Sequence, residues 1–155
     1  MKKIILGLFL ILGAISFAVP KYVNTTKLQN AGYEITGDDE DLFSFGKSTK
    51  EAGISVAFYP APNQSVTSKA ISEAVKASAP DGVKFMSSLD NKRAYVLKFK
   101  DGEIYTYNFV PKNQKIKACH ISVLYMTDKD LSGANLDKAV NSVLNEAESF
   151  LKIVK

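Results

Sequence analysis

Residues 93–125, RAYVLKFKDGEIYTYNFVPKNQKIKACHISVLY, decide the fold of this chain. They contain three runs rich in aromatic and β-branched residues, with residues typical of turns between the runs. The strongest turn signal is Asp101-Gly102, a dipeptide that supplies the positive φ angles of a two-residue type I′ hairpin. The stretch therefore predicts an antiparallel meander of three strands.

The predicted hairpin fixes which residues face each other. With Asp101-Gly102 as the turn, the facing pairs are Lys100 with Glu103, Phe99 with Ile104, Lys98 with Tyr105, Leu97 with Thr106 and Val96 with Tyr107. This register gathers Lys98, Tyr105 and Tyr107 on one side, where they are the candidate ligand-binding residues. Exposed, they would form a stacking or protein-contact patch; covered by a helix, they would belong to the core with Lys98 reaching its edge. The second arrangement is favoured because aromatic residues on a sheet usually pack inward.

Two amphipathic stretches can cover the sheet. Residues 65–79 follow a possible Ser65 cap and place an apolar stripe on one helical face, made of Val66, Ala70, Ile71, Ala74 and Val75. Residues 135–154 follow an Asn135 cap with a longer stripe, made of Leu136, Val140, Val143, Leu144, Ala147, Leu151 and Val154. We therefore expect a middle helix and a long C-terminal helix.

The remaining elements are short. Residues 24–32 predict a single helical turn that Gly32 ends, and residues 33–36, 42–45 and 54–59 predict a first small meander. Further strands are expected over 83–87 and 116–125. The order of elements predicts an α+β domain whose antiparallel sheet is covered by the middle helix and the C-terminal helix.

The composition is that of one ordinary globular domain. The chain has 155 residues, of which 46% are hydrophobic and 23% are charged, and its net charge is +4. Without Lys2 and Lys3 the chain has 18 basic and 16 acidic residues, which leaves a net charge of about +2. So small an excess, without a basic block, calls for neither a nucleic-acid partner nor an anionic membrane surface.

Residues 1–18 have the three parts of a bacterial secretory signal. Lys2 and Lys3 form the charged start, residues 4–15 are almost all apolar, and Ser16-Phe17-Ala18 supplies the small residues that signal peptidase requires. A membrane anchor is the alternative, but the apolar run is shorter than the ~20 residues of a spanning helix. We expect cleavage between Ala18 and Val19, a single domain over 19–155 without a membrane span, and a periplasmic or secreted location.

The single cysteine and the single histidine are neighbours at positions 119 and 120. On a strand Cys119 would face the core together with Ile121, Val123 and Tyr125, whereas His120 would face the other way. A base on the opposite face cannot activate the thiol, so a buried structural cysteine is favoured over a nucleophile. His120 is expected to be solvated or hydrogen-bonded. Since neither residue has the usual companion ligands, no metal and no cofactor are predicted.

Three fragments resemble functional motifs incompletely. Gly46-Lys47-Ser48 resembles the end of a phosphate-binding loop, but Asp41 replaces the first glycine, so a solvated loop is expected. Gly53-Ile54-Ser55 resembles a nucleophile elbow, but Ala57 replaces the last glycine, so a strand serine is expected. The acidic cluster 38–41 lacks the spaced ligands of a calcium loop and indicates a charged turn.

The order of elements resembles the PsbP/Mog1 type of small α/β/α domain. The resemblance covers nearly the whole mature chain and is carried by the opening Ala31-Gly32-Tyr33-Glu34-Ile35, the middle helix, the meander, and a closing helix that ends Glu148-Ser149-Phe150. It implies a protein that binds or supports partners, and it assigns no functional residue. The YbjN-like and type III secretion chaperone proteins have a similar outline and remain the alternative.

Two functions of different classes are compatible with this sequence. The first is a non-enzymatic envelope protein that binds a partner protein or a small ligand. The second is a small periplasmic hydrolase whose acidic and serine residues are dispersed along the chain. Binding is favoured because the sequence contains no recognisable acid, base or nucleophile arrangement. A pocket with converging carboxylates would favour the enzyme instead.

We predict that the exported protein begins at Val19, because the small residues at positions 16 and 18 follow directly on the apolar run. Intact-mass measurement of protein from the cell envelope tests this. A mass that includes residues 1–18 would contradict the prediction.

Overall fold

The computed structural model describes residues 19–60 and 66–152 and has the predicted α+β class. Its elements in chain order are α1 (Thr25–Asn30), β1 (Glu34–Asp38), β2 (Phe43–Ser48), β3 (Ala52–Pro60), α2 (Ser68–Ala77), β4 (Lys84–Leu89), β5 (Ala94–Asp101), β6 (Ile104–Pro111), β7 (Cys119–Thr127) and α3 (Gly133–Glu148).

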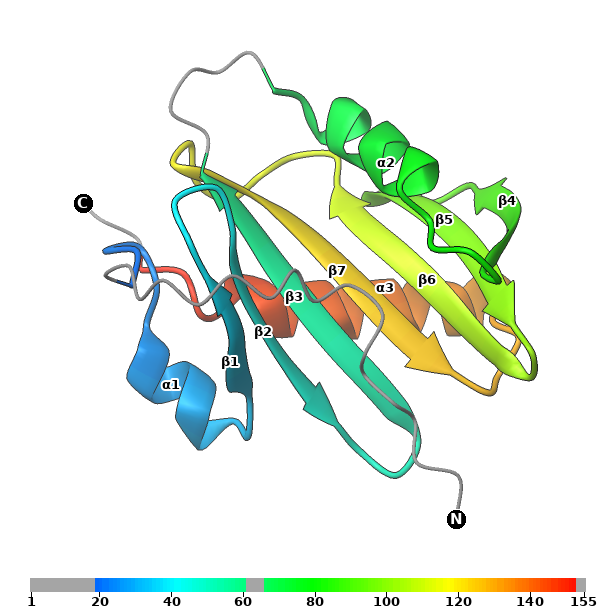
Figure 1. Ribbon diagram of the computed structural model, residues 1–155, viewed down its shortest axis with the longest axis horizontal. Helices are drawn as coiled ribbons and strands as arrows, with labels where there is room; N and C mark the ends of the chain where they lie inside the picture. Colours follow the sequence, from blue (N-terminus) through cyan, green and yellow to red (C-terminus); the bar gives the residue numbers. More distant parts are fainter. Residues whose placement is uncertain (1–18, 61–65, 153–155) are drawn as a thin grey trace.

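All seven strands form one antiparallel sheet in the order β1-β2-β3-β7-β6-β5-β4. The first meander, β1 to β3, is made before α2, and the second, β4 to β7, is made after it. The chain passes from β3 through α2 to the far edge of the sheet, and the second meander returns to the middle (Figure 1). The two meanders join where β7 pairs with β3.

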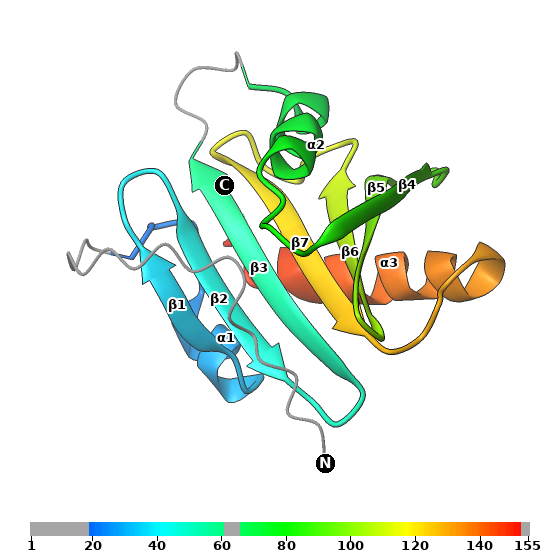
Figure 2. The same cartoon turned by 45° about the vertical axis from the view of Figure 1, so that its right-hand side comes forward.

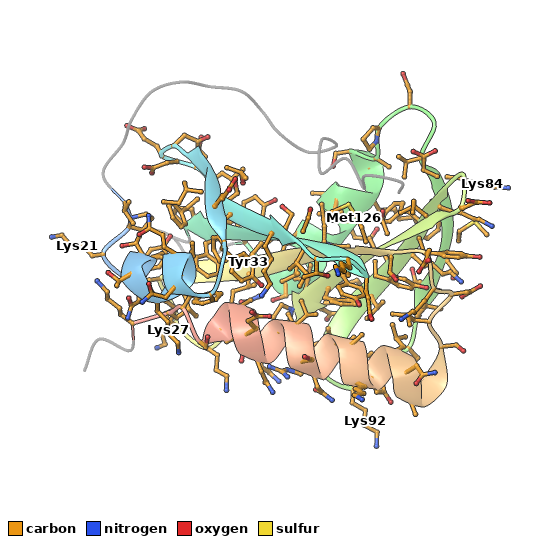
Figure 3. The ribbon with its side chains drawn as sticks, turned by 90° about the horizontal axis from the view of Figure 1, so that it is seen from below. Lys21, Lys27, Tyr33, Lys84, Lys92 and Met126 are labelled. Carbon is orange, nitrogen blue, oxygen red and sulfur yellow. The ribbon has the colours of Figure 1, made fainter. Side chains whose placement is uncertain are left out.

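The long helix and the middle helix cover opposite faces of the sheet. In Figure 1, α3 runs behind the strands and α2 lies in front of the half of the sheet formed by β5, β6 and β7. The view from below separates the two layers, with α3 on one side of the sheet and Met126 on the other (Figure 3). The structure therefore has three layers over its second half.

The main core lies between the sheet and α3. It contains the inward side chains of the central strands, and the predicted stripe of α3 packs on them. The fully buried members include Phe43, Phe45, Val56, Phe58, Tyr107, Phe109, Ile121, Val123, Val140 and Leu144. The stripe from Leu136 to Ala147 is confirmed. Leu151 is also buried, but it lies beyond the helix and pairs with Val23.

The predicted short first helix is confirmed. The side chain of Asn24 accepts a hydrogen bond from the backbone N–H of Lys27 at 3.0 Å, which is an N-cap, and Gly32 follows with a φ of +81°. Leu28 of α1 is fully buried, so the helix fixes the start of the chain to the core.

The hairpin between β5 and β6 forms, but its predicted turn is wrong by one position. Asp101 pairs with Ile104, so the two turn residues are Gly102 and Glu103. Gly102 has a φ of +55°, whereas no residue other than glycine has a positive φ in the described chain, so the φ of Glu103 is negative. A positive φ at the first turn residue alone is the pattern of a type II′ turn. A type I′ turn at Asp101-Gly102 would have forced Asp101 into that region. The shift changes each partner by two residues, so every side chain keeps its predicted face.

The predicted stripe of the middle helix is confirmed at Ile71, which is buried, but it is wrong at most of its other positions. The helix begins at Ser68 behind a Thr67 cap, and its buried residues are Ser68, Ile71 and Ser72. Ala70 and Ala74, placed inside by the prediction, are exposed, and Val66 is 47% exposed. The two serines can face the sheet because polar side chains line that face too: the Nε2 of Gln114 donates to the Oγ of Ser68 at 2.9 Å.

Two further predictions need correction. Gly46-Lys47-Ser48 belongs to β2 instead of a solvated loop, since its residues pair with β3 and the Nζ of Lys47 lies 4.4 Å from the centre of the Tyr33 ring. The long helix begins at Gly133 behind Ser132, so Asn135 is inside the helix and does not cap it. The predicted signal sequence with Ala18, the predicted Ser65 cap and Val154 lie outside the described residues.

We predict that Leu144→Ala lowers the free energy of unfolding by roughly 2–5 kcal/mol, because Leu144 is fully buried in the middle of α3. Lys138→Ala, on the exposed side of the same helix, should change it by less than about 0.5 kcal/mol. Urea unfolding measures both. Equal midpoints for the two variants would show that the buried face of α3 is misassigned.

Candidate functional site

Lys98, Tyr105 and Tyr107 lie on the α3 side of the sheet, near the loop that precedes α3. Lys98 pairs with Tyr107 across the hairpin, and the Nζ of Lys98 lies 4.8 Å from the centre of the Tyr105 ring. That ammonium also forms an ion pair with Asp130. The hydrogen bond with Asp130 raises the pKa of Lys98, and the same contact lowers the pKa of Asp130. Both charges are stabilised by each other.

Tyr107 is fully buried and serves the packing of the loop. Its hydroxyl accepts a hydrogen bond from the backbone N–H of Leu131 at 2.7 Å and donates to the carbonyl of Lys129 at 3.4 Å. Its ring stacks between those of Tyr105 and Phe109 at centroid distances of 6.5 and 6.3 Å. The structure therefore brings the three candidate residues together. They form the edge of the core, and the charged group of Lys98 and the hydroxyl of Tyr107 are already bonded within the protein.

A groove opens on the other face of the sheet, between α2 and the strands β4 and β5. We call it the α2 groove. It encloses about 260 Å³, and the side chains that characterise it are Lys69, Ser72, Glu73, Asp90, Tyr95 and Lys112. Figure 2 shows α2 beside β4 and β5 at this end of the sheet. None of these residues was a candidate in the sequence.

Asn91 holds the strand side of the α2 groove in place. This buried side chain accepts hydrogen bonds from the backbone N–H groups of Arg93 (2.9 Å) and Ala94 (3.0 Å), and it donates to a carboxylate oxygen of Asp137 at 2.6 Å. The backbone carbonyl of Asn91 accepts a hydrogen bond from the Nζ of Lys112 at 2.6 Å. The bend before β5 is thereby tied to α3 and to the end of β6.

The polar groups of the α2 groove have few partners. Within residues 19–60 and 66–152, the side chains of Lys69, Glu73 and Asp90 form no ion pair and no hydrogen bond. Ser72 is only 4% exposed, yet its hydroxyl has no hydrogen-bond partner in the same part of the chain. The hydroxyl oxygen itself is not fully buried, so it is open to the groove and available to a ligand.

The layer behind α2 is unusually polar. Asn108 is fully buried on this face and donates a hydrogen bond from Nδ2 to the Oγ of Ser122 at 2.8 Å. Its Oδ1 has no partner among the described residues. Polar atoms here weaken the apolar contact between α2 and the sheet.

Cys119 and His120 have the predicted opposite orientations. Cys119 is 1% exposed in the main core, and burial raises the pKa of its thiol from an ordinary 9.0 to about 12. His120 is half-buried on the α2 side opposite Tyr59, and its Nδ1 has no hydrogen-bond partner in the described chain. The thiol is therefore protonated and shielded, which is the state of a structural cysteine.

Two further properties hold for the part of the chain that the structure describes. No three His, Cys, Asp or Glu side chains lie close enough together to hold a metal ion. None of the helices is both long and apolar enough to cross a membrane.

Comparison with models of known protein families, with curated proteins and with solved structures found no match to this chain. The role of the α2 groove is therefore inferred from its own side chains. Sequence reasoning missed the groove because Lys69 and Glu73 look like an ordinary solvated helix face. The one available signal was Ser68 and Ser72, which are four residues apart and lie next to Ile71 and Val75 on a helix.

We predict that Cys119→Ser destabilises the protein more than Cys119→Ala, because the serine hydroxyl would be buried without a partner. The native thiol should also react with a thiol reagent far more slowly than the unfolded one.

The contribution of the Cys119 thiol to stability is full below about pH 9, where the thiol is protonated in both the folded and the unfolded state. It is lost as pH rises toward 12, because in this range only the unfolded thiol is ionised. Urea unfolding at about pH 8 and about pH 10 measures this, with a loss of up to about 1.4 kcal/mol per pH unit in wild type that Cys119→Ala removes. Rapid native labelling would make Cys119 a candidate for chemistry.

Proposed function

We propose that this chain is an exported, non-enzymatic binding module of a bacterial cell envelope and that it holds a small ligand in the α2 groove. The observation that supports this most strongly is the groove itself, where three charged side chains without partners in the described chain, Lys69, Glu73 and Asp90, lie near the unpaired hydroxyl of Ser72. Small-molecule sites combine a concave shape with a few such polar groups. The signal-like residues 1–18 are the reason for an envelope location.

The placement of the acidic groups favours binding over hydrolysis. A hydrolase needs an acid and a base that act together on one bond. The two carboxylates of the α2 groove come from different walls, Glu73 from α2 and Asp90 from the strand side. Each wall also carries a lysine, Lys69 on the first and Lys112 on the second. This alternation suits the recognition of a charged ligand more than the activation of water.

We also propose a relationship to the PsbP/Mog1 type of domain. The order of elements, with two meanders separated by a helix and followed by a long helix, is the order on which the resemblance rests. The two short segments that carry it are in contact, since the rings of Tyr33 and Phe150 pack edge to face at 5.2 Å. Contact between these segments supports a shared architecture and assigns no ligand.

We predict that Ser72→Leu abolishes ligand binding, because the larger side chain fills the α2 groove at the position of the serine hydroxyl. The probe is the low-molecular-mass fraction of an extract of the producing cells. In two-dimensional NMR spectra, this fraction should shift the backbone signals of groove residues in wild type and leave those of Ser72→Leu unchanged.

Ala74→Leu is the matched control, since it introduces the same side chain on the exposed face of α2. It should bind like wild type, and thermal unfolding should show that both variants are folded. If the extract shifts the groove signals of Ser72→Leu as strongly as those of wild type, or shifts none in wild type, the proposed function is wrong.

A further inference from the structure

The charges of the α2 groove are balanced. Lys69 and Glu73 are one helical turn apart on α2, and Asp90 and Lys112 stand on the strand side. Lys69, Glu73 and Asp90 have no ion-pair or hydrogen-bond partner among the described residues, and the Nζ of Lys112 donates one hydrogen bond, to the carbonyl of Asn91. The groove therefore offers two cations and two anions to whatever enters it.

This balance selects against ligands with a single charge. An anion that approaches the two lysines also meets two carboxylates, and a cation meets two ammonium groups, so part of the attraction is cancelled in either case. A ligand that carries one positive and one negative group can satisfy both kinds of side chain at once. The groove therefore favours a ligand that carries both a positive and a negative group over a ligand that carries only one of them.

The remaining surface of the groove indicates the size and the neutral part of the ligand. A volume of about 260 Å³ lies just below the range of roughly 300–1,000 Å³ that is usual for the pockets of drug-sized ligands, so it suits a smaller molecule. Tyr95, which is half-buried, and Leu97, which is 4% exposed, supply apolar contact. The unpaired hydroxyl of Ser72 can donate or accept one further hydrogen bond.

We propose that the α2 groove binds a free α-amino acid with an apolar side chain, an inference that rests on the proposed function above. The carboxylate of the ligand pairs with Lys69 and Lys112, and its ammonium group pairs with Glu73 and Asp90. The apolar side chain lies against Tyr95 and Leu97. A zwitterion of this size meets the charge, the volume and the apolar surface together.

Three probes with one side chain test the requirement for both charges. L-Leucine is the zwitterion, leucinamide keeps only the ammonium group, and 4-methylpentanoate keeps only the carboxylate. Titrated separately into the full chain under NMR observation, L-leucine should shift the backbone signals of the groove residues. The two single-charge analogues should bind at least about tenfold more weakly.

Charge-removing variants assign the partners. Lys69→Gln should weaken L-leucine and 4-methylpentanoate and leave leucinamide unchanged, whereas Glu73→Gln should weaken L-leucine and leucinamide and leave 4-methylpentanoate unchanged. Both residues are exposed and free of partners in the described chain, so the variants should fold normally. Lys138→Gln, on the exposed side of α3, is the control and should bind L-leucine like wild type.

Two results would overturn the inference. One is an analogue with a single charge that binds as tightly as L-leucine, and the other is the absence of any groove shift with L-leucine at about 10 mM, a concentration above the Kd of even weak specific ligands. In either case, extract-induced shifts that Ser72→Leu abolishes would leave the proposed binding function intact, so the two failures are distinguishable.

Discussion

The ladder between β3 and β7 is the interaction on which the rest of the structure depends. It runs from Ala52 opposite Thr127 to Pro60 opposite Cys119 and joins strands that are far apart in the sequence. Each meander can form from local contacts, but neither has a complete core until these strands meet. The loop-closure entropy is offset by full burial of facing pairs in the centre, Val56 with Val123 and Phe58 with Ile121. The position of α2 is a consequence, because the chain must cross a face of the sheet to reach the far edge.

The two faces of the sheet are held by different physical means. Under α3 the contact is mainly apolar and aromatic; the hydroxyl of Tyr107 is bonded at its margin, whereas the buried hydroxyls of Tyr22 and Tyr33 have no hydrogen-bond partner among the described residues. Under α2 the contact includes Asn108 and His120, each with a buried polar atom that has no partner among the described residues. Burial of such atoms lowers the net stabilisation from packing. Both faces carry this cost, and what distinguishes the α2 face is the polar lining of its groove, where we propose that a ligand binds.

The sequence predicted the features that depend on long periodic patterns. The stripe of α3, the strand alternation that buries Cys119, and the order of elements follow from apolar spacing, which the whole core reinforces. The turn at Gly102 was misplaced by one residue because Asp-Gly fits two turn types, and the local sequence does not show which one the strand twist prefers. The stripe of α2 was wrong because alanine is neutral between surface and core. Of the two serines that do face the sheet, Ser68 bonds to the distant Gln114, a partner that no local pattern reveals.

The two edges of the sheet divide stability and binding between them. At the β1 edge, the end of α3 is tied to the start of the chain: the N–H of Asn24 donates to the carbonyl of Phe150 at 2.8 Å, and the N–H of Lys152 donates to that of Tyr22 at 2.7 Å. The ring of Phe150 is fixed there between the rings of Tyr33 and Phe45. The opposite edge, at β4, is covered only in part by α2, and its charged groove side chains have few bonds. Side chains with few bonds can adjust to a ligand at small cost, whereas the aromatic edge would lose packing if it moved. The ligand that we propose for the α2 groove would therefore bind at the edge where side-chain movement disturbs the least packing.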